Sequence, residues 1–132
     1  GEIHGAAENY AQYHTTLDVS ITDLLKATLR MRPDRILVGE VRDGAALDLL
    51  DAWNTGHEGG AATLHANSAE AGLSRLKSLI TRNASAPKEI EPLIGEAVHV
   101  VVHIARNHDG RFVREILEIS GYENDRYLTR KL

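Results

Sequence analysis

The chain has 132 residues, of which 42% are hydrophobic and 26% charged, an ordinary globular composition that argues against extensive disorder. Its formal net charge of −4 provides no overall positive field, so we expect no direct sequence-specific binding to nucleic acid. The absence of cysteine excludes disulfide scaffolds, thiolate zinc sites and cysteine nucleophiles.

The first half of the chain predicts helices that alternate with short strands. The S-x-x-D pattern at Ser20 is a capping box, and the apolar spacing after it predicts a helix that Pro33 ends. The continuous apolar run over residues 35–41 predicts a strand that is buried on both faces. A second helix is expected over 43–54, and a strand of small residues over 59–65.

The second half predicts two more helices and then a hairpin. Ser68 caps the third helix, expected over 69–82, and Pro87 opens a short fourth helix. We expect two antiparallel strands and a frayed tail to follow, over 97–106, 112–122 and 123–132 respectively. Strands that alternate with helices predict an α/β fold, with a mainly parallel sheet, helices on its faces and the C-terminal hairpin at its edge.

Two further sequence patterns are missing. No apolar run has the length of a membrane span and no segment resembles a signal peptide, so we expect a cytoplasmic protein. No lysine directly follows a glycine, so the chain contains no Walker A phosphate-binding loop.

Glu40 lies near the carboxyl end of the first predicted strand. An acidic residue at the carboxyl end of a parallel strand faces the crevice in which α/β folds bind ligands. In phosphate-transfer enzymes such a carboxylate holds Mg²⁺ or orients the attacking water. A solvated glutamate after a core strand is the alternative, and this pattern alone does not decide between them.

Two histidines, His57 and His65, flank the predicted strand of small residues. An imidazole beside a nucleotide could sense a terminal phosphate. Their spacing is not that of a helical metal-binding pair and no third ligand is evident, which argues against zinc. Two surface histidines at loop ends remain the alternative. His99 and His103, on a valine-rich segment, are interpreted as residues of a strand rather than as metal ligands.

Three segments together resemble the secretion traffic ATPases, the hexameric motors of type IV secretion, conjugation, type II secretion and type IV pili. Residues 32–43 resemble the family's Walker B segment, and residues 55–69 resemble its histidine box. Glu2-Ile3 resembles the end of its Asp box. The conjugal transfer branch is the most similar, and the likeness is strongest over residues 21–79.

The resemblance implies that residues 1–132 are the C-terminal part of a RecA-like P-loop ATPase domain, without the Walker A loop and the N-terminal domain. The intact parent would be a homohexamer that hydrolyses ATP with Mg²⁺. It would work in the cytoplasm, peripheral to the inner membrane, with other components of conjugation or type IV secretion. Because this chain lacks the loop that holds the phosphates, we expect it to have negligible ATPase activity by itself.

The resemblance also implies roles for individual residues. Glu40 would be the catalytic Walker B acid that holds Mg²⁺ through water, and Glu2 would be the remaining catalytic acid of the Asp box. His65 would take part in catalysis and, with His57, would sense the γ-phosphate or couple it to neighbouring subunits. Arg42 would brace the Walker B acid.

Two other interpretations remain open. The chain could be a non-catalytic interaction or oligomerisation module that keeps the fold without the phosphate loop. Within the same superfamily it could belong to a type IV pilus or type II secretion motor. The type II motors carry a cysteine-rich insertion that this cysteine-free chain lacks.

Overall fold

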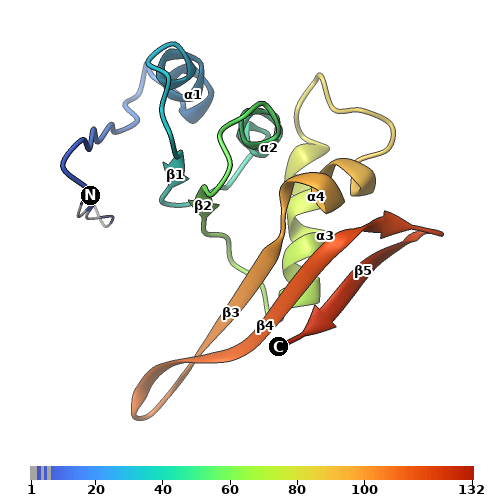
Figure 1. Cartoon of the computed structure of the whole chain (residues 1–132). Coiled ribbons are helices and arrows are strands. Elements are labelled where there is room, and N and C mark those ends of the chain that lie inside the picture. Colours follow the sequence, from blue (N-terminus) through green and yellow to red (C-terminus); the bar gives the residue numbers. More distant parts are fainter. Residues whose placement is uncertain (1–2, 4, 6) are drawn as a thin grey trace.

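The computed structural model describes residues 3, 5 and 7–132 (Figure 1). Within these residues the elements follow one another in this order: α1 (Ile21–Leu29), β1 (Leu37–Val38), α2 (Ala45–Asn54), β2 (Ala61–Ala62), α3 (Ala69–Ile80), α4 (Glu91–Ala97), β3 (Val100–Asn107), β4 (Gly110–Glu123) and β5 (Arg126–Lys131). In the described part of the chain no helix is both long and apolar enough to cross a membrane.

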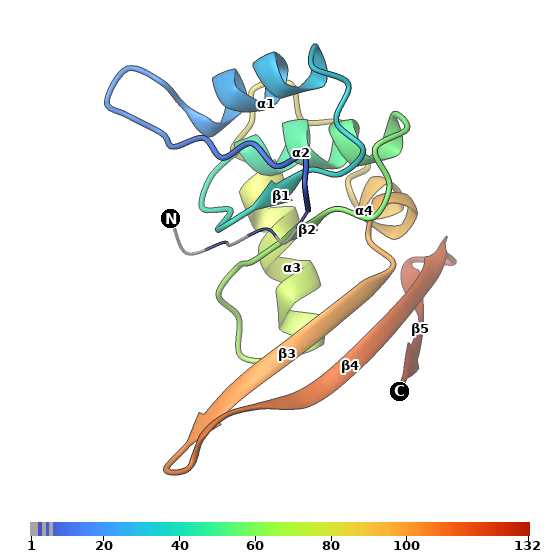
Figure 2. The same cartoon turned by 60° about the vertical axis from the view of Figure 1, so that its left-hand side comes forward.

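The strands that the structure describes form two sheets. β1 and β2 pair in parallel, and β3, β4 and β5 form an antiparallel sheet in that order. The β3–β4 hairpin projects away from α1 and α2 in both views (Figures 1 and 2). The predicted α/β class is therefore confirmed, but the C-terminal strands form a sheet of their own instead of an edge of the parallel sheet.

The parallel sheet is shorter and more exposed than the sequence predicts. β1 spans two residues instead of 35–41, and the side chain of Leu37 is 47% exposed. The prediction of a strand buried on both faces is therefore wrong. Ile36 is buried in the core and Val38 packs against it, whereas Leu37 and Gly39 are exposed, so only one side of residues 36–39 is covered by the described residues. A continuous apolar run does not reveal that difference between the two faces.

The segment predicted to be frayed is the strand β5, which pairs with β4 along its length. Asn124 and Asp125 connect the two strands, and both have positive φ angles, of 51° and 59°. A type I′ hairpin turn requires positive φ at both central residues, and Asn and Asp tolerate this conformation. The Asn-Asp pair is thus the feature of the sequence that marks this turn.

The predicted helices are present, with small differences at their ends. Ser20 forms the expected capping box and Ser68 caps α3 through its side chain. Pro92 lies in the first turn of α4, where its missing N–H has no intrahelical partner to lose. The helix therefore begins beside Pro92, later than the start expected at Pro87.

One hydrophobic core connects the helices with the C-terminal sheet. Its largest fully buried side chains come from α2, α3, α4 and β4: Leu50, Leu79, Ile80, Ile94 and Leu117. The parallel strands are joined to this core through α2, since the indole of Trp53 donates a hydrogen bond to the carbonyl of Ile36 at 3.2 Å. This hydrogen bond holds the backbone at Ile36, four residues before Glu40, against α2.

Candidate functional site

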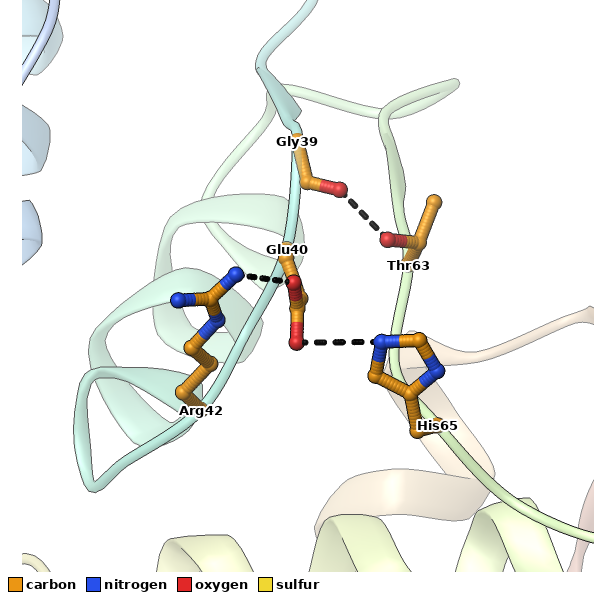
Figure 3. Close-up of polar contacts among 5 residues, drawn as sticks. All are labelled: Gly39, Glu40, Arg42, Thr63 and His65. Carbon is orange, nitrogen blue, oxygen red and sulfur yellow. Dashed lines mark hydrogen bonds and ion pairs between the residues drawn. The ribbon is translucent and has the colours of Figure 1, made fainter.

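Hydrogen bonds continue the parallel pairing beyond the two short strands. The backbone N–H of Val41 donates to the carbonyl of Thr63 at 2.9 Å. The Thr63 hydroxyl donates to the carbonyl of Gly39 (Figure 3). These bonds hold the two chain segments side by side at the carboxyl ends of β1 and β2. Glu40 and His65 consequently lie next to each other, although 24 positions separate the hydrogen-bonded pair Gly39 and Thr63.

Glu40 lies between a guanidinium and an imidazole (Figure 3). Its Oε2 is 2.5 Å from Nη2 of Arg42, and its Oε1 is 3.4 Å from Nε2 of His65. The Glu40 side chain is 25% exposed, whereas that of His65 is 92% exposed. The carboxylate is thus held in place while the imidazole has room to rearrange around a ligand.

The charge of Glu40 is stabilised by its surroundings. The hydrogen bond from Arg42 is the largest influence and lowers the pKa of the carboxyl group; partial desolvation raises it, and the electrostatic interactions with Arg42 and His65 lower it further. Glu40 is therefore ionised at neutral pH. An ionised carboxylate can accept hydrogen bonds from water or contact a cation.

Among the described residues, Glu40 is the carboxylate that this site offers to a metal. Within the described residues, no group of three or more His, Cys, Asp or Glu side chains is arranged to hold a metal ion. Mg²⁺ in nucleotide sites keeps several waters and takes one or two carboxylates together with substrate phosphates. Glu40 fits that requirement, directly or through water, because within the described residues its Oε1 contacts only the exposed His65, at 3.4 Å.

His57 lies apart from this group of residues. It precedes β2 along the chain, whereas Glu40 and His65 follow the parallel strands at their carboxyl ends. Its Nδ1 is 3.2 Å from the carbonyl of Ala52, near the end of α2. Of the residues named from the sequence, the structure brings together Glu40, His65 and Arg42, and it does not bring His57 to them.

Glu2 lies outside the described residues. Thr63 was not predicted, yet its hydroxyl closes the contact between the segments that carry Glu40 and His65. Its position two residues before His65, at the end of a small-residue strand, was the available signal.

Comparisons with known proteins identify the family to which this chain belongs. Residues 2–125 match the family described as "Type II/IV secretion system protein". Over 128 residues the chain is 54% identical to the conjugal transfer protein TrbB of Rhizobium radiobacter, which covers 97% of this chain and 39% of that protein. It is 37% identical over 102 residues to Protein VirB11 of Agrobacterium fabrum, covering 74% of this chain and 30% of the relative.

A solved structure is also similar. The crystal structure of the VirB11 ATPase from the Brucella suis type IV secretion system, in complex with sulphate, matches with a TM-score of 0.70 and 37% sequence identity. The match covers 74% of this chain and 31% of that one.

The chain therefore belongs to the type II/IV secretion system protein family, and its α/β fold is shared with the VirB11 ATPase. Within that family its relatives include the TrbB and VirB11 proteins of conjugal transfer and type IV secretion. The chain spans 39% and 38% of the length of two TrbB relatives.

Proposed function

We propose that this chain carries the carboxylate and histidine part of the ATP site in an ATPase that powers conjugal transfer through a type IV secretion system. The observation that supports this most is the position of Glu40. It is an ionised carboxylate at the carboxyl end of a parallel strand, in contact with His65 and Arg42. Ligands of α/β folds bind at this end of the sheet.

Each of these side chains has a distinct task in the proposed reaction. Glu40 accepts a hydrogen bond from the attacking water and aligns it with the γ-phosphorus. Arg42 keeps Glu40 ionised and oriented. His65, exposed beside Glu40, turns toward the γ-phosphate and donates a hydrogen bond from its ring. Bound with ATP, Mg²⁺ would neutralise phosphate charge, with Glu40 as its protein ligand, directly or through water.

His57 has a different place in this proposal. Because it lies at the other end of the parallel strands, it is poorly placed to contact the phosphate that His65 contacts. We assign it to coupling with a neighbouring subunit. Glu2 keeps its proposed role as an acid of the Asp box on the basis of the sequence resemblance alone.

The rest of the ATP site would come from other parts of the parent protein. No lysine follows a glycine in this chain, so the loop that binds the β- and γ-phosphates would lie in the part of the parent that these residues do not include. We propose that residues 1–132 are the C-terminal part of its RecA-like domain. The parent would be a homohexamer in the cytoplasm, peripheral to the inner membrane, with other transfer components as partners.

A transfer experiment tests this function. Donor cells that lack the parent gene receive the wild-type gene, Glu40→Gln or Glu58→Gln. Glu58 is an exposed acid of the histidine-box segment before β2, which makes it the matched control. We expect Glu58→Gln to restore plasmid transfer and Glu40→Gln to fail, at equal protein levels. Normal transfer with Glu40→Gln would refute the proposal.

A further inference from the structure

Glu115 on β4 connects three elements of the fold. Its Oε2 accepts a hydrogen bond from the backbone N–H of Ala69, the first residue of α3, at 3.0 Å. Its Oε1 is 2.9 Å from Nζ of Lys131, at the end of β5. The Glu115 side chain is 18% exposed. We refer to these two contacts together as the Glu115 bridge.

Both contacts of the Glu115 bridge favour a charged carboxylate. The N–H groups of the first helical turn have no intrahelical acceptor, and the helix dipole attracts negative charge there. The hydrogen bond from Lys131 is the largest influence on the pKa of Glu115 and lowers it, and the bond from Ala69 acts in the same direction. In both contacts the acceptor is a charged carboxylate. Hydrogen bonds that involve an ionised group are stronger than those between neutral groups.

The bridge lies at one end of the segment that carries His65. On the strand side, Thr63 is fixed to Gly39 through its hydroxyl. On the helix side, Ser68 caps α3, and Ala69, which is fully buried, is bound to Glu115. Figure 2 shows this segment leaving β2 and descending to the start of α3 beside the C-terminal sheet.

From this arrangement we infer that Glu115 is a positioning residue for His65. By tying the start of α3 to β4 and β5, it sets the geometry of the short span that presents His65 to Glu40. The C-terminal sheet thereby becomes a support of the ATP site. This inference rests on the proposed role of His65 in hydrolysis.

The same two strands provide a matched control. Glu118 and Arg130 are directly opposite each other on β4 and β5, one position along from the pair Leu117 and Lys131. Their side chains form an ion pair at 2.7 Å. Glu118→Gln therefore removes an ion pair between the same strands and leaves the contact to Ala69 in place.

Steady-state ATP hydrolysis by the purified parent protein tests the inference. A 1 Å misplacement of a catalytic group can cost on the order of 100-fold in rate, and because Gln keeps one acceptor for Ala69 we expect Glu115→Gln to lower kcat about tenfold with KM little changed. Glu118→Gln should keep kcat within about twofold of wild type, as expected for an exposed ion pair. Lys131→Met removes the ion pair but keeps the hydrogen bond between Glu115 and Ala69, so we expect a loss of kcat between those of the other two variants. This variant replaces Glu115→Gln if that protein folds poorly.

A double-mutant cycle with His65→Ala shows whether Glu115 acts through His65. We expect Glu115→Gln to cost nothing further once His65 is removed, because its effect is carried by that side chain. The charge swap Glu115→Lys with Lys131→Glu restores opposite charges but places an ammonium group at the start of α3. We expect the swapped protein to stay impaired.

Three results would overturn the inference: equal losses from Glu115→Gln in the presence and absence of His65, an equal loss from Glu118→Gln, or full rescue by the charge swap. Full activity of His65→Ala would instead refute the proposed role of His65. In that case, amide hydrogen exchange tests the positioning effect of the Glu115 bridge independently of ATP hydrolysis. Faster exchange over residues 64–69 in Glu115→Gln than in Glu118→Gln would support positioning, and unchanged exchange would contradict it.

Discussion

The two sheets of this molecule differ in how they are held together. The parallel pair β1–β2 has two residues in each strand, and Leu37 within it is almost half exposed. In the antiparallel sheet, β4 alone spans 14 residues and buries Leu117 and Ile119 in the core. The residues proposed to act on ATP lie at the end of the first sheet, and the larger share of regular pairing lies in the second.

This difference separates the structural part of the molecule from the candidate site. Functional side chains commonly lie on irregular segments that a rigid scaffold positions. Here Glu40 and His65 lie just beyond very short strands, where single hydrogen bonds from Thr63 and Trp53 fix the backbone. The antiparallel sheet and the helices supply the rigidity, and Glu115 connects that scaffold to the site.

The largest stability effect is expected in the antiparallel sheet. Leu117→Ala removes a side chain that is 1% exposed, and such a change costs about 2–5 kcal/mol in the free energy of unfolding. Leu37→Ala in β1 should cost less, about 1 kcal/mol, because almost half of this residue stays exposed to water in the folded protein. Urea unfolding of both variants measures this. Equal losses would show that the two sheets contribute alike.

A smaller effect is expected where β2 approaches α2. A Cβ atom at Gly60 would lie 2.0 Å from Nε1 of Trp53 and 2.5 Å from the carbonyl oxygen of Ile36. Gly60→Ala should therefore displace β2 and cost about 1–3 kcal/mol through overpacking. Gly39→Ala is the control, since its Cβ would meet only Ile3 at 3.8 Å among the described residues. Thermal unfolding should separate the two variants, and equal melting temperatures would contradict the close packing.

The antiparallel sheet also contains a position where a substitution should be harmless. The Tyr127 hydroxyl is buried and has no hydrogen-bond partner among the described residues, and burial is the main reason that its pKa is raised to about 12. Removing an unsatisfied buried group relieves a desolvation cost, so Tyr127→Phe should leave stability unchanged or raise it by up to about 1 kcal/mol. A clear loss in the urea midpoint would indicate a partner for the hydroxyl.

The smallest effect concerns pH at the parallel sheet. Arg42 lowers the pKa of Glu40 below its ordinary value of 4.5, so the ion pair favours folding above the unfolded-state pKa and this contribution is lost as the pH falls through the lower, folded value. Arg42→Gln should raise the Glu40 pKa toward 4.5, which a carbon-detected NMR titration measures. Arg35→Gln, at the other end of β1, should leave it unchanged. An unmoved Glu40 pKa in Arg42→Gln would contradict the pairing.

Much of this fold could be predicted from local sequence signals. The caps at Ser20 and Ser68 located two helices, because a side-chain acceptor at the helix start is a local feature. The exposure of Leu37 could not be predicted, because it depends on which face of the strand is covered. The strand β5 was missed because its residues are mostly polar and only the Asn-Asp turn marked it.

The candidate site was predictable to a similar extent. The positions of Glu40 and His65 at the ends of predicted strands identified each of them separately. Their contact at 3.4 Å depends on the parallel pairing of β1 with β2, which is seen only in the structure. The separation of His57 from them has the same origin. Glu115 could not be identified from a local sequence motif, because its partner Ala69 is 46 positions away in the sequence.

The most direct test of the proposed role of Glu40 is ATP turnover by the purified parent protein with Glu40→Gln, measured together with nucleotide binding. The variant keeps the size of the side chain and removes its charge. We expect a loss of kcat of at least about 100-fold, in the range expected for a group that orients or activates the reacting water, with nucleotide binding retained. Turnover close to that of the wild type, with folding and assembly intact, would contradict the assignment of Glu40 to the ATP site.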